Sequence, residues 1–205
     1  LVNLGAIDDA MVLYEGAIKH DPNCEQAYIE MAEVMAMKKE PQATIDYYYK
    51  ALDINPNSGI CLLRLARYFK NIKEPKMAMN FIQKIAQLGM INKEILLEQA
   101  EILQNIGLYE ESIFSSKQLL EMDNQNSKAF NLIGTSLLEL GIIDDAIERF
   151  CDAIYLEADV GHYYCNLGIA LSRDGRFKDA EECLHKSIEL IENSSRNHYE
   201  LGKLY

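Results

Sequence analysis

The sequence predicts an all-α fold, a solenoid of tandem antiparallel helix pairs. The first observation behind this prediction is a period of 34 residues, which continues through the 205-residue chain without an insertion or a deletion. The second is a small residue that returns once in every period. That position is held by Ala10, Thr44, Ala78, Ser112, Ala146 and Ala180. A strict period of this length is typical of stacked helical repeats, so we expect one stacked fold rather than several globular domains.

Other positions of the period keep the same register. Twelve residues before the small residue stands alanine or glycine, and four residues after it most units carry a large apolar side chain. The earlier position is held by Ala32, Ala66, Ala100, Gly134 and Gly168. Small residues let two helices approach closely, and large ones fill the space beside them. Each period therefore predicts two amphipathic helices, whose apolar faces become buried only when neighbouring units stack.

The first helices of the chain are separated by proline turns. A helix at 7–20 carries two aspartates at its start and ends before the Asp-Pro-Asn turn at Pro22, which leads to a helix at 25–38. The Asn-Pro-Asn turn at Pro56 leads in the same way to a helix at 59–72.

Two further helices, at 41–54 and 75–88, start at a proline. Pro41 and Pro75 each follow a Lys-Glu pair at the same place in successive units. Proline suits the first position of a helix, because the N–H that it lacks would have no helical partner. We therefore interpret the Lys-Glu-Pro segments as another way of starting the second helix of a unit.

The rest of the chain uses glycine turns before the second helices, at Gly107, Gly141 and Gly175. With the same period, first helices are predicted at 93–106, 127–140 and 161–174, and second helices at 109–122, 143–156 and 177–190. Residues 195–205 provide most of one more first helix without its partner.

These columns resemble the tetratricopeptide repeat family over the whole chain. One unit holds the large, Leu-Gly, aromatic, small, aromatic and alanine places of the family with Tyr164, Leu167-Gly168, Leu171, Ala180, Leu184 and Ser187. Another holds them, with the closing proline, as Tyr28, Met31-Ala32, Met35, Thr44, Tyr48, Ala51 and Pro56. The resemblance implies a right-handed superhelical α-solenoid of about six repeats.

The register divides the chain into repeats that share one solenoid over residues 1–205. It predicts a partial repeat at 1–24, repeats at 25–58, 59–92, 93–126, 127–160 and 161–194, and a partial repeat at 195–205. Both ends fall inside a unit, and solenoids need polar caps at their ends. We therefore expect the chain to be a fragment, or the ordered part, of a longer protein.

Composition limits the partners. The formal charge of −12 and the pI near 4.8 argue against nucleic acid, because binding phosphates needs a cationic surface. No run of 18 apolar residues occurs, so we expect no membrane insertion. The five cysteines are odd in number and form no Cys-x-x-Cys pair, which favours reduced thiols and a cytoplasmic protein. Because the chain starts without methionine, a removed signal peptide stays an open alternative.

In this family the first helices line a concave groove, so the resemblance implies a binding site for a protein or peptide segment there. The candidate groove residues are Ile29, Glu30, Glu33, Leu63, Arg64, Arg67, Lys70, Leu97, Glu98, Glu101, Asn131, Asn166 and Ile169. In this set a basic band from 64 to 70 lies between acidic bands at 30–33 and 94–101.

Two interpretations of the bands stay open. In the first, the basic band binds carboxylates of an extended or helical peptide, and Ile29, Leu63 and Leu97 supply apolar contact. In the second, neighbouring first helices neutralise one another through surface ion pairs, each worth about 0–1 kcal/mol.

Two subfamilies can be compared position by position. Chaperone-docking members hold a peptide carboxylate pair with Lys and Asn of one helix, Asn of the next, and Lys and Arg of the third. In the register starting at the fifth unit these places hold Asn131, Thr135, Asn166, Arg196 and Glu200, and neither this register nor those starting at the second and third units match the clamp. We therefore do not expect C-terminal peptides of heat-shock chaperones as partners. A glycosyltransferase subfamily carries an asparagine ladder, which only Asn166 fits.

No motif in the chain predicts chemistry. His162 and Cys165 lie one helical turn apart, but no second matched pair completes a metal site, so we expect no metal and no cofactor. The sequence contains no phosphate-binding loop, nucleophile elbow or zinc-protease helix. The chain is therefore predicted not to be an enzyme.

The leading functional prediction is a non-enzymatic scaffold or adaptor that binds a protein segment in its concave groove. One alternative is a regulatory or targeting segment of a larger enzyme. Another is a scaffold that self-associates into homo-oligomers, such as an organelle-associated or envelope-associated assembly factor.

Overall fold

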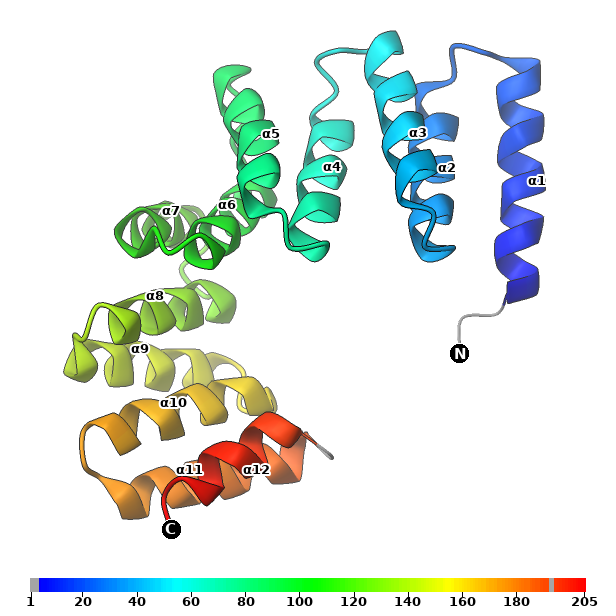
Figure 1. The fold of residues 1–205 in the computed structure, drawn as a ribbon. Helices are drawn as coiled ribbons and strands as arrows, with labels where there is room; N and C mark the ends of the chain where they lie inside the picture. The colour runs from blue at the N-terminus through cyan, green and yellow to red at the C-terminus, as the bar shows by residue number, and fades with distance from the viewer. Residues whose placement is uncertain (1–3, 192–193) are drawn as a thin grey trace. The chain divides into compact units, whose positions relative to one another are not determined.

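In the computed structural model the described part of the chain, residues 4–191 and 194–205, is helical throughout (Figure 1). Residues 1–3 of the predicted first partial repeat and residues 192–193 at the end of the sixth unit lie outside the described residues. Twelve helices are present in the described residues: α1 (Leu4–His20), α2 (Glu25–Met37), α3 (Pro41–Ile54), α4 (Gly59–Asn71), α5 (Pro75–Gln87), α6 (Lys93–Asn105), α7 (Tyr109–Met122), α8 (Ser127–Glu139), α9 (Ile143–Leu156), α10 (Gly161–Arg173), α11 (Phe177–Leu190) and α12 (Ser195–Gly202).

The helix prediction is confirmed, with small shifts at the boundaries. Helix α1 begins three residues before the predicted start at position 7. The first helices of the repeats end one residue early, because the last residue predicted for them is the C-cap. In α2, for example, the N–H of Lys38 still donates to the Val34 carbonyl at 3.0 Å although Lys38 itself lies outside the helix, and the N–H of Lys39 donates to the Ala36 carbonyl at 3.1 Å.

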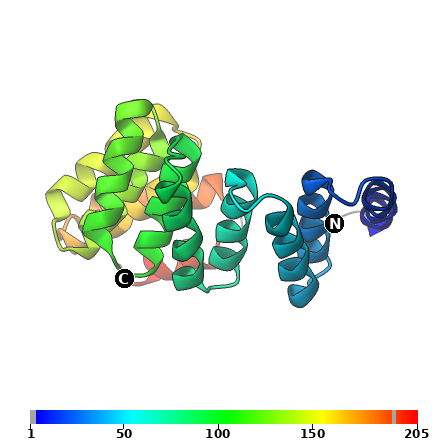
Figure 2. The same ribbon diagram turned by 90° about the horizontal axis from the view of Figure 1, so that it is seen from above.

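Contacts between residues divide the chain into two compact units, Leu1–Ile91 (unit 1) and Asn92–Tyr205 (unit 2). In unit 1, α2 pairs with α3 and α4 with α5, and α1 packs on α2. The helices of each pair run antiparallel and lie side by side (Figures 1 and 2). The division into repeats stays a prediction.

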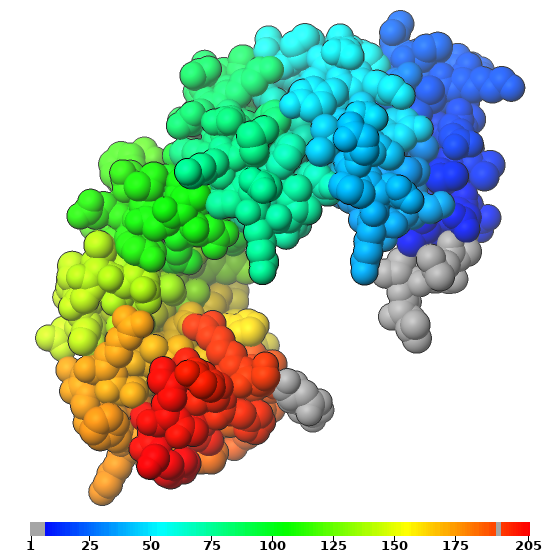
Figure 3. Space-filling view, viewed as in Figure 1, coloured from blue at the N-terminus to red at the C-terminus, as the bar shows by residue number. Residues whose placement is uncertain are grey.

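In unit 2 the pairs are α6–α7, α8–α9 and α10–α11, and α12 packs on α11. Each second helix also contacts the first helix of the following pair, and the first helices α6, α8 and α10 contact one another in sequence. These three helices therefore form one layer of the unit. Within each unit the side chains close the gaps that the ribbon leaves between helices (Figure 3).

The small positions of the period are the points of closest helix approach. Thr44, Ala78, Ser112, Ala146 and Ala180 are fully buried. A β-carbon built on Gly134 would lie 2.8 Å from the ring of Phe150, and one built on Gly168 would lie 2.8 Å from Leu184 Cγ. The α8–α9 and α10–α11 pairs thus approach so closely that only glycine fits, and the large residue of the second helix covers it.

The turn that joins the two helices of a pair has the same left-handed backbone conformation in every pair, although the residue there is lysine in unit 1 and glycine in unit 2. Gly107, Gly141 and Gly175 have φ between +80° and +82° in unit 2, and Lys39 and Lys73 occupy the same position in unit 1 with φ of +61° and +64°. Helices α3 and α5 then start at proline, as predicted. The lysines hold a left-handed conformation that is disfavoured for residues with a β-carbon.

Candidate functional site

The predicted groove residues lie on the first helices, α2 and α4 in unit 1 and α6, α8 and α10 in unit 2. An apolar contact strip needs exposed side chains, but the apolar residues of this set are buried or half-buried. Ile29 is 1% exposed and Leu63 is 7% exposed, so these two side chains offer little surface to a partner. Leu97 and Ile169 are half-buried and keep part of their surface open.

In unit 1 the charged residues of α2 and α4 pair with each other. The Arg64 guanidinium lies 3.3 Å from Glu30 Oε1 and 3.5 Å from Glu33 Oε1, and the Tyr48 hydroxyl donates to Glu33 Oε1 at 2.5 Å. For Arg64 this geometry favours mutual neutralisation over a vacant carboxylate-binding site. Arg67, Lys70, Glu94, Glu98 and Glu101 also interact with other groups. Exposed ion pairs contribute about 0–1 kcal/mol each, and these pairs are half-buried, so we take that range as a lower bound for the free energy needed to separate them.

Two groups below this network are kept neutral. Burial raises the pKa of the Tyr48 hydroxyl far above its ordinary value, and the hydrogen bond to the Glu33 carboxylate raises it further. Burial also raises the pKa of the Cys61 thiol to about 12, and this thiol donates to the Tyr48 carbonyl at 3.5 Å. Neither side chain is an activated nucleophile near neutral pH, so both act in packing.

Unit 2 contains a row of polar side chains that crosses three first helices. Asn166 Nδ2 on α10 donates to Asn131 Oδ1 on α8 at 2.8 Å. Arg196 on α12 donates to Asn166 Oδ1 at 3.2 Å. The neighbouring Asn197 is buried and donates to Ser187 Oγ on α11 at 2.7 Å, which fixes α12 against its neighbour. The row is therefore held in place at its α12 end.

The row borders an open pocket of about 190 Å³. Its floor reaches the core of the pairs, where Phe150, Gly168 and Leu184, all buried, line its base. The walls carry Asn166, Ile169, Arg173, Arg196, Glu200 and Lys203, among others.

The charges of this pocket are only partly balanced. Arg173 donates to the Leu138 carbonyl at 3.0 Å and to Glu139 Oε1 at 3.2 Å, and Lys203 donates to Glu200 Oε2 at 2.8 Å. The hydrogen bond that Arg196 makes to Asn166 neutralises no charge, because the amide is uncharged. The pocket thus combines a cation, amides and an apolar floor.

Sequence reasoning placed Asn131 and Asn166 in the groove but missed their contact. The two residues are 35 positions apart, one more than the period. They therefore do not hold the same position of the repeat, and a comparison of equivalent positions does not pair them. Arg173 and Arg196 also take groove-facing places of the period, but they are not among the candidate groove residues, whose charged members follow the bands at 30–33, 64–70 and 94–101. The signal that could have found them is the cluster of Arg173, Arg196 and Lys203 at the end of an acidic chain.

The structure brings together no metal-binding cluster within residues 4–191 and 194–205. Cys165, next to His162 in the predicted pair, is fully buried, and burial raises the pKa of its thiol. In the same described ranges, no helix has the length and apolar character needed to cross a membrane.

Comparison with known proteins identifies two repeats in unit 2. A family model described as tetratricopeptide repeat matches residues 94–126 and 161–194, within one residue of two predicted repeats. Over 181 residues the chain is 27% identical to the human protein O-mannosyl-transferase TMTC3. This alignment covers 85% of the chain but only 20% of that relative.

Solved structures share the fold at low identity. The type IV pilus biogenesis factor PilW matches with a TM-score of 0.82 and 18% identity, over 95% of this chain and 90% of PilW. YrrB, described as a TPR protein with an unusual peptide-binding site, matches with a TM-score of 0.69 and 17% identity, over 91% of this chain and 96% of YrrB. With its 34-residue period, its helix pairs and the two matched repeats, the chain belongs to the tetratricopeptide repeat family, whose members are protein-binding repeat proteins.

Proposed function

We propose that this chain is a non-enzymatic scaffold that binds an extended segment of a partner protein along the first helices of unit 2. The observation that carries the proposal is the pocket at Asn166 and Arg196, to which the three successive first helices α8, α10 and α12 contribute polar groups above an apolar floor, with Asn131 bonded to Asn166 beside it. Sites that bind peptides combine in this way a few fixed polar groups with an apolar recess.

The chemistry of the pocket indicates what the segment carries. The amides of Asn131 and Asn166 offer donors and acceptors that suit a peptide backbone. Arg196 adds a guanidinium with no carboxylate among the partners described for it, which suits an acidic side chain or a chain end. The recess over Gly168 suits an apolar side chain. We therefore propose an extended segment in which an acidic residue stands close to an apolar one.

Heat-shock chaperone peptides are not proposed. Of the five places of the chaperone clamp, Asn166 matches and Arg196 supplies a cation, but Asn131, Thr135 and Glu200 stand where lysine, asparagine and arginine are needed. The Glu200 carboxylate would repel the second carboxylate of such a peptide.

The cellular location is also a proposal. All five cysteines are free thiols, which fits a reducing compartment, and we propose that the protein acts in the cytoplasm.

The proposal is tested by panning a phage-displayed library of random 12-residue peptides on the chain. Enriched peptides are then measured for affinity to the wild type, to Asn166→Ala and to Arg196→Ala. The matched control is Arg149→Ala, which removes a guanidinium from α9, outside the lining of the pocket. We expect affinity to fall about tenfold or more in both pocket variants and to stay within twofold in the control. Peptides that bind all four proteins equally would refute a site at this pocket.

A second candidate function is a regulatory or targeting segment of a larger enzyme. It is favoured by the match to an O-mannosyl-transferase of which the chain spans only a fifth. The full reading frame tests it, because a catalytic domain beside the repeats would support it and a frame of repeats alone would count against it.

A further inference from the structure

A second concave feature of unit 2 lies among the helices α7, α8 and α9 and shares no residue with the pocket at Asn166. Ile113 and Leu120 of α7 and Ile133 and Leu137 of α8 form its apolar part. Lys117 of α7 and Asp145, Glu148 and Arg149 of α9 form its charged walls. We call this feature the α7–α9 cleft. It has a volume of about 370 Å³, and four of its eight lining residues are apolar.

The apolar part of the cleft is only incompletely covered by the chain. Ile113, Leu120 and Leu137 are half-buried, and Ile133 beneath them is 3% exposed. The same two second helices carry large exposed side chains, with Phe114 on α7 at 63% and Tyr155 on α9 at 90% exposure. Neither of these two side chains lines the cleft, so the apolar surface that a partner would cover there is that of Ile113, Leu120 and Leu137.

The helices around the cleft are strongly acidic. Among the residues of α7 and α9, seven carboxylates stand against Lys117 and Arg149, a net charge of −5. Along the chain, 21 acidic and ten basic residues fall within 92–205, so unit 2 carries −11 of the net charge of −12. Acidic residues in the first turn stabilise a helix, but Glu121, Glu148 and Asp152 lie beyond that turn and need another explanation.

Arg149 reduces this negative potential only locally. Its guanidinium lies 2.9 Å from Asp152 Oδ2, contacts Glu148, and stands 5.8 Å from the centroid of the Phe130 ring. These contacts hold the arginine against its own helix and α8, leaving Asp145 and the remaining carboxylates to face solvent. Lys117 is the other cation of the two helices and stands on the opposite wall.

We propose that the α7–α9 cleft docks a basic amphipathic helix of a partner protein. The apolar face of that helix would cover Ile113, Leu120 and Leu137, and its lysines or arginines would meet the excess carboxylates that α7 and α9 carry around the cleft. The four charged residues that line the cleft balance one another, but the net charge of −5 on α7 and α9 around it disfavours nucleic acid and acidic membrane surfaces at this position. It also disfavours a second copy of this chain, whose net charge of −12 would be repelled. The site is independent of the pocket at Asn166.

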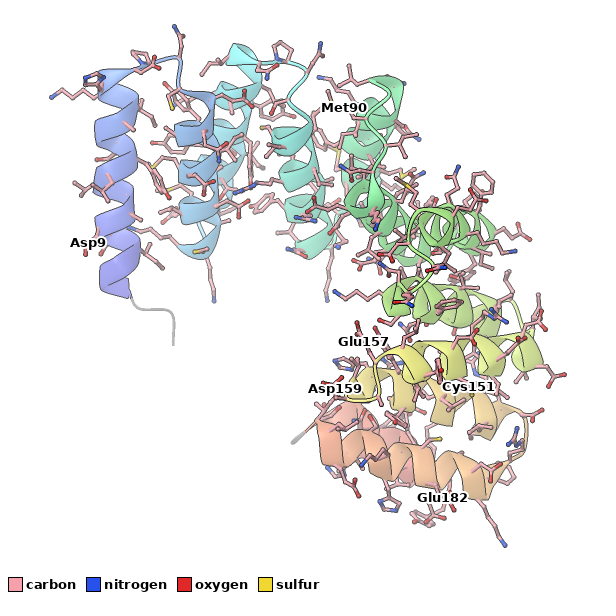
Figure 4. The ribbon with its side chains drawn as sticks, turned by 180° about the vertical axis from the view of Figure 1, so that it is seen from behind. Asp9, Met90, Cys151, Glu157, Asp159 and Glu182 are labelled. Atoms are coloured by element: carbon pink, nitrogen blue, oxygen red, sulfur yellow. The ribbon has the colours of Figure 1, made fainter. Side chains whose placement is uncertain are left out.

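The experiment uses a synthetic 14-residue peptide of leucine and lysine, with leucine at helical spacing, labelled for fluorescence anisotropy. The first variant is Asp145→Lys with Glu148→Lys, which reverses two charges on the cleft wall. The matched control is Asp159→Lys with Glu182→Lys, the same change of charge outside the cleft. Asp159 lies in the α9–α10 connection and Glu182 on α11 (Figure 4). A third variant, Lys117→Glu, makes the cleft more acidic.

We expect the cleft variant to weaken peptide binding about tenfold or more, the control to weaken it less than threefold, and Lys117→Glu to strengthen it severalfold. Helical circular dichroism confirms that each variant is folded. Equal weakening by the cleft variant and the control would overturn the proposal, because the attraction would then be general to an acidic protein. The proposal is equally overturned if a peptide with serine in place of leucine binds as tightly, since the apolar part would then play no role.

A peptide selected for the pocket at Asn166 separates this site from the proposed function. Its affinity should not change in the cleft variant, and the leucine–lysine peptide should bind normally to Asn166→Ala. If both peptides lose affinity in the same variants, there is one site and the proposal of a second is wrong.

Discussion

Replacing Gly134 by alanine sets helix propensity against packing, and the two effects have opposite signs. Gly134 lies inside α8 and faces Phe150 of α9, which is fully buried. An added β-carbon would lie 2.8 Å from Cδ1 and Cε1 of the ring and 3.1 Å from Cζ. The contact atoms belong to a rigid ring, so the helices must separate or the ring must turn.

The magnitudes decide the sign. Alanine in place of glycine favours a helix by about 0.5–1 kcal/mol. Forcing an extra carbon into a packed core costs about 1–3 kcal/mol. We therefore expect Gly134→Ala to destabilise the protein by about 1–2 kcal/mol, which lowers the melting temperature by about 2–8 °C in a chain of this size.

The assay is calorimetric unfolding of Gly134→Ala beside a control with the same substitution in open space. A β-carbon on Gly16 of α1 meets nothing within 4 Å, so Gly16→Ala should raise the melting temperature. Adding Phe150→Ile to Gly134→Ala gives the pair found at the same positions of the repeat at 59–92, Ala66 and Ile82. The double variant should recover part of the lost stability. If Gly134→Ala stabilises the chain as Gly16→Ala does, the packing argument is refuted.

Three further outcomes are expected. Lys73→Gly should stabilise by about 0.5–1 kcal/mol, because relief of the left-handed backbone exceeds the entropy that glycine adds to the unfolded chain, whereas Gly141→Lys should destabilise; equal melting temperatures would contradict this. The buried Ser116 hydroxyl has no hydrogen-bond partner among the described residues, whereas that of Ser112 donates to the Ala100 carbonyl at 2.8 Å. Urea unfolding should therefore show Ser116→Ala stabilising and Ser112→Ala destabilising, each by about 1 kcal/mol, and shifts of the same sign would count against the assignment. Because the pKa of Tyr48 is raised, the unfolded chain releases that proton above about pH 10 while the folded chain keeps it. Stability should fall as the pH rises past 10, and less steeply in Tyr48→Phe; parallel curves would show that Tyr48 is not the group responsible.

The helices and their pairing could be predicted from the sequence because packing repeats with the period. Every repeat must place a small residue where its two helices cross. Ala32 and Gly134 therefore hold the same position of their repeats, 102 residues apart. The turns could also be predicted, since Lys39 and Gly141 hold the same place in their repeats and both adopt a left-handed backbone conformation. The match between residue columns and helices reflects a local rule that each unit satisfies by itself.

The candidate site could be predicted less well, because its contacts run between neighbouring repeats. Asn131 and Asn166 meet although they are not at equal positions of the period. Ile29 was placed on the groove by its column, yet the neighbouring helices cover it. Whether Arg64 faces a partner or Glu33 depends on side-chain directions in two helices, and a one-dimensional register does not contain them.

The distribution of charge over unit 2 links the two proposed sites. Core columns are constrained by packing, whereas the exposed positions of the first and second helices are free to differ. Here the pocket at Asn166 gathers Arg173, Arg196 and Lys203, and the α7–α9 cleft lies among carboxylates. One unit could thus hold an acidic segment and a basic helix without competition between them. Saturating one site should leave the affinity of the other unchanged apart from a weak attraction between the two bound segments, and that attraction should decrease with added salt.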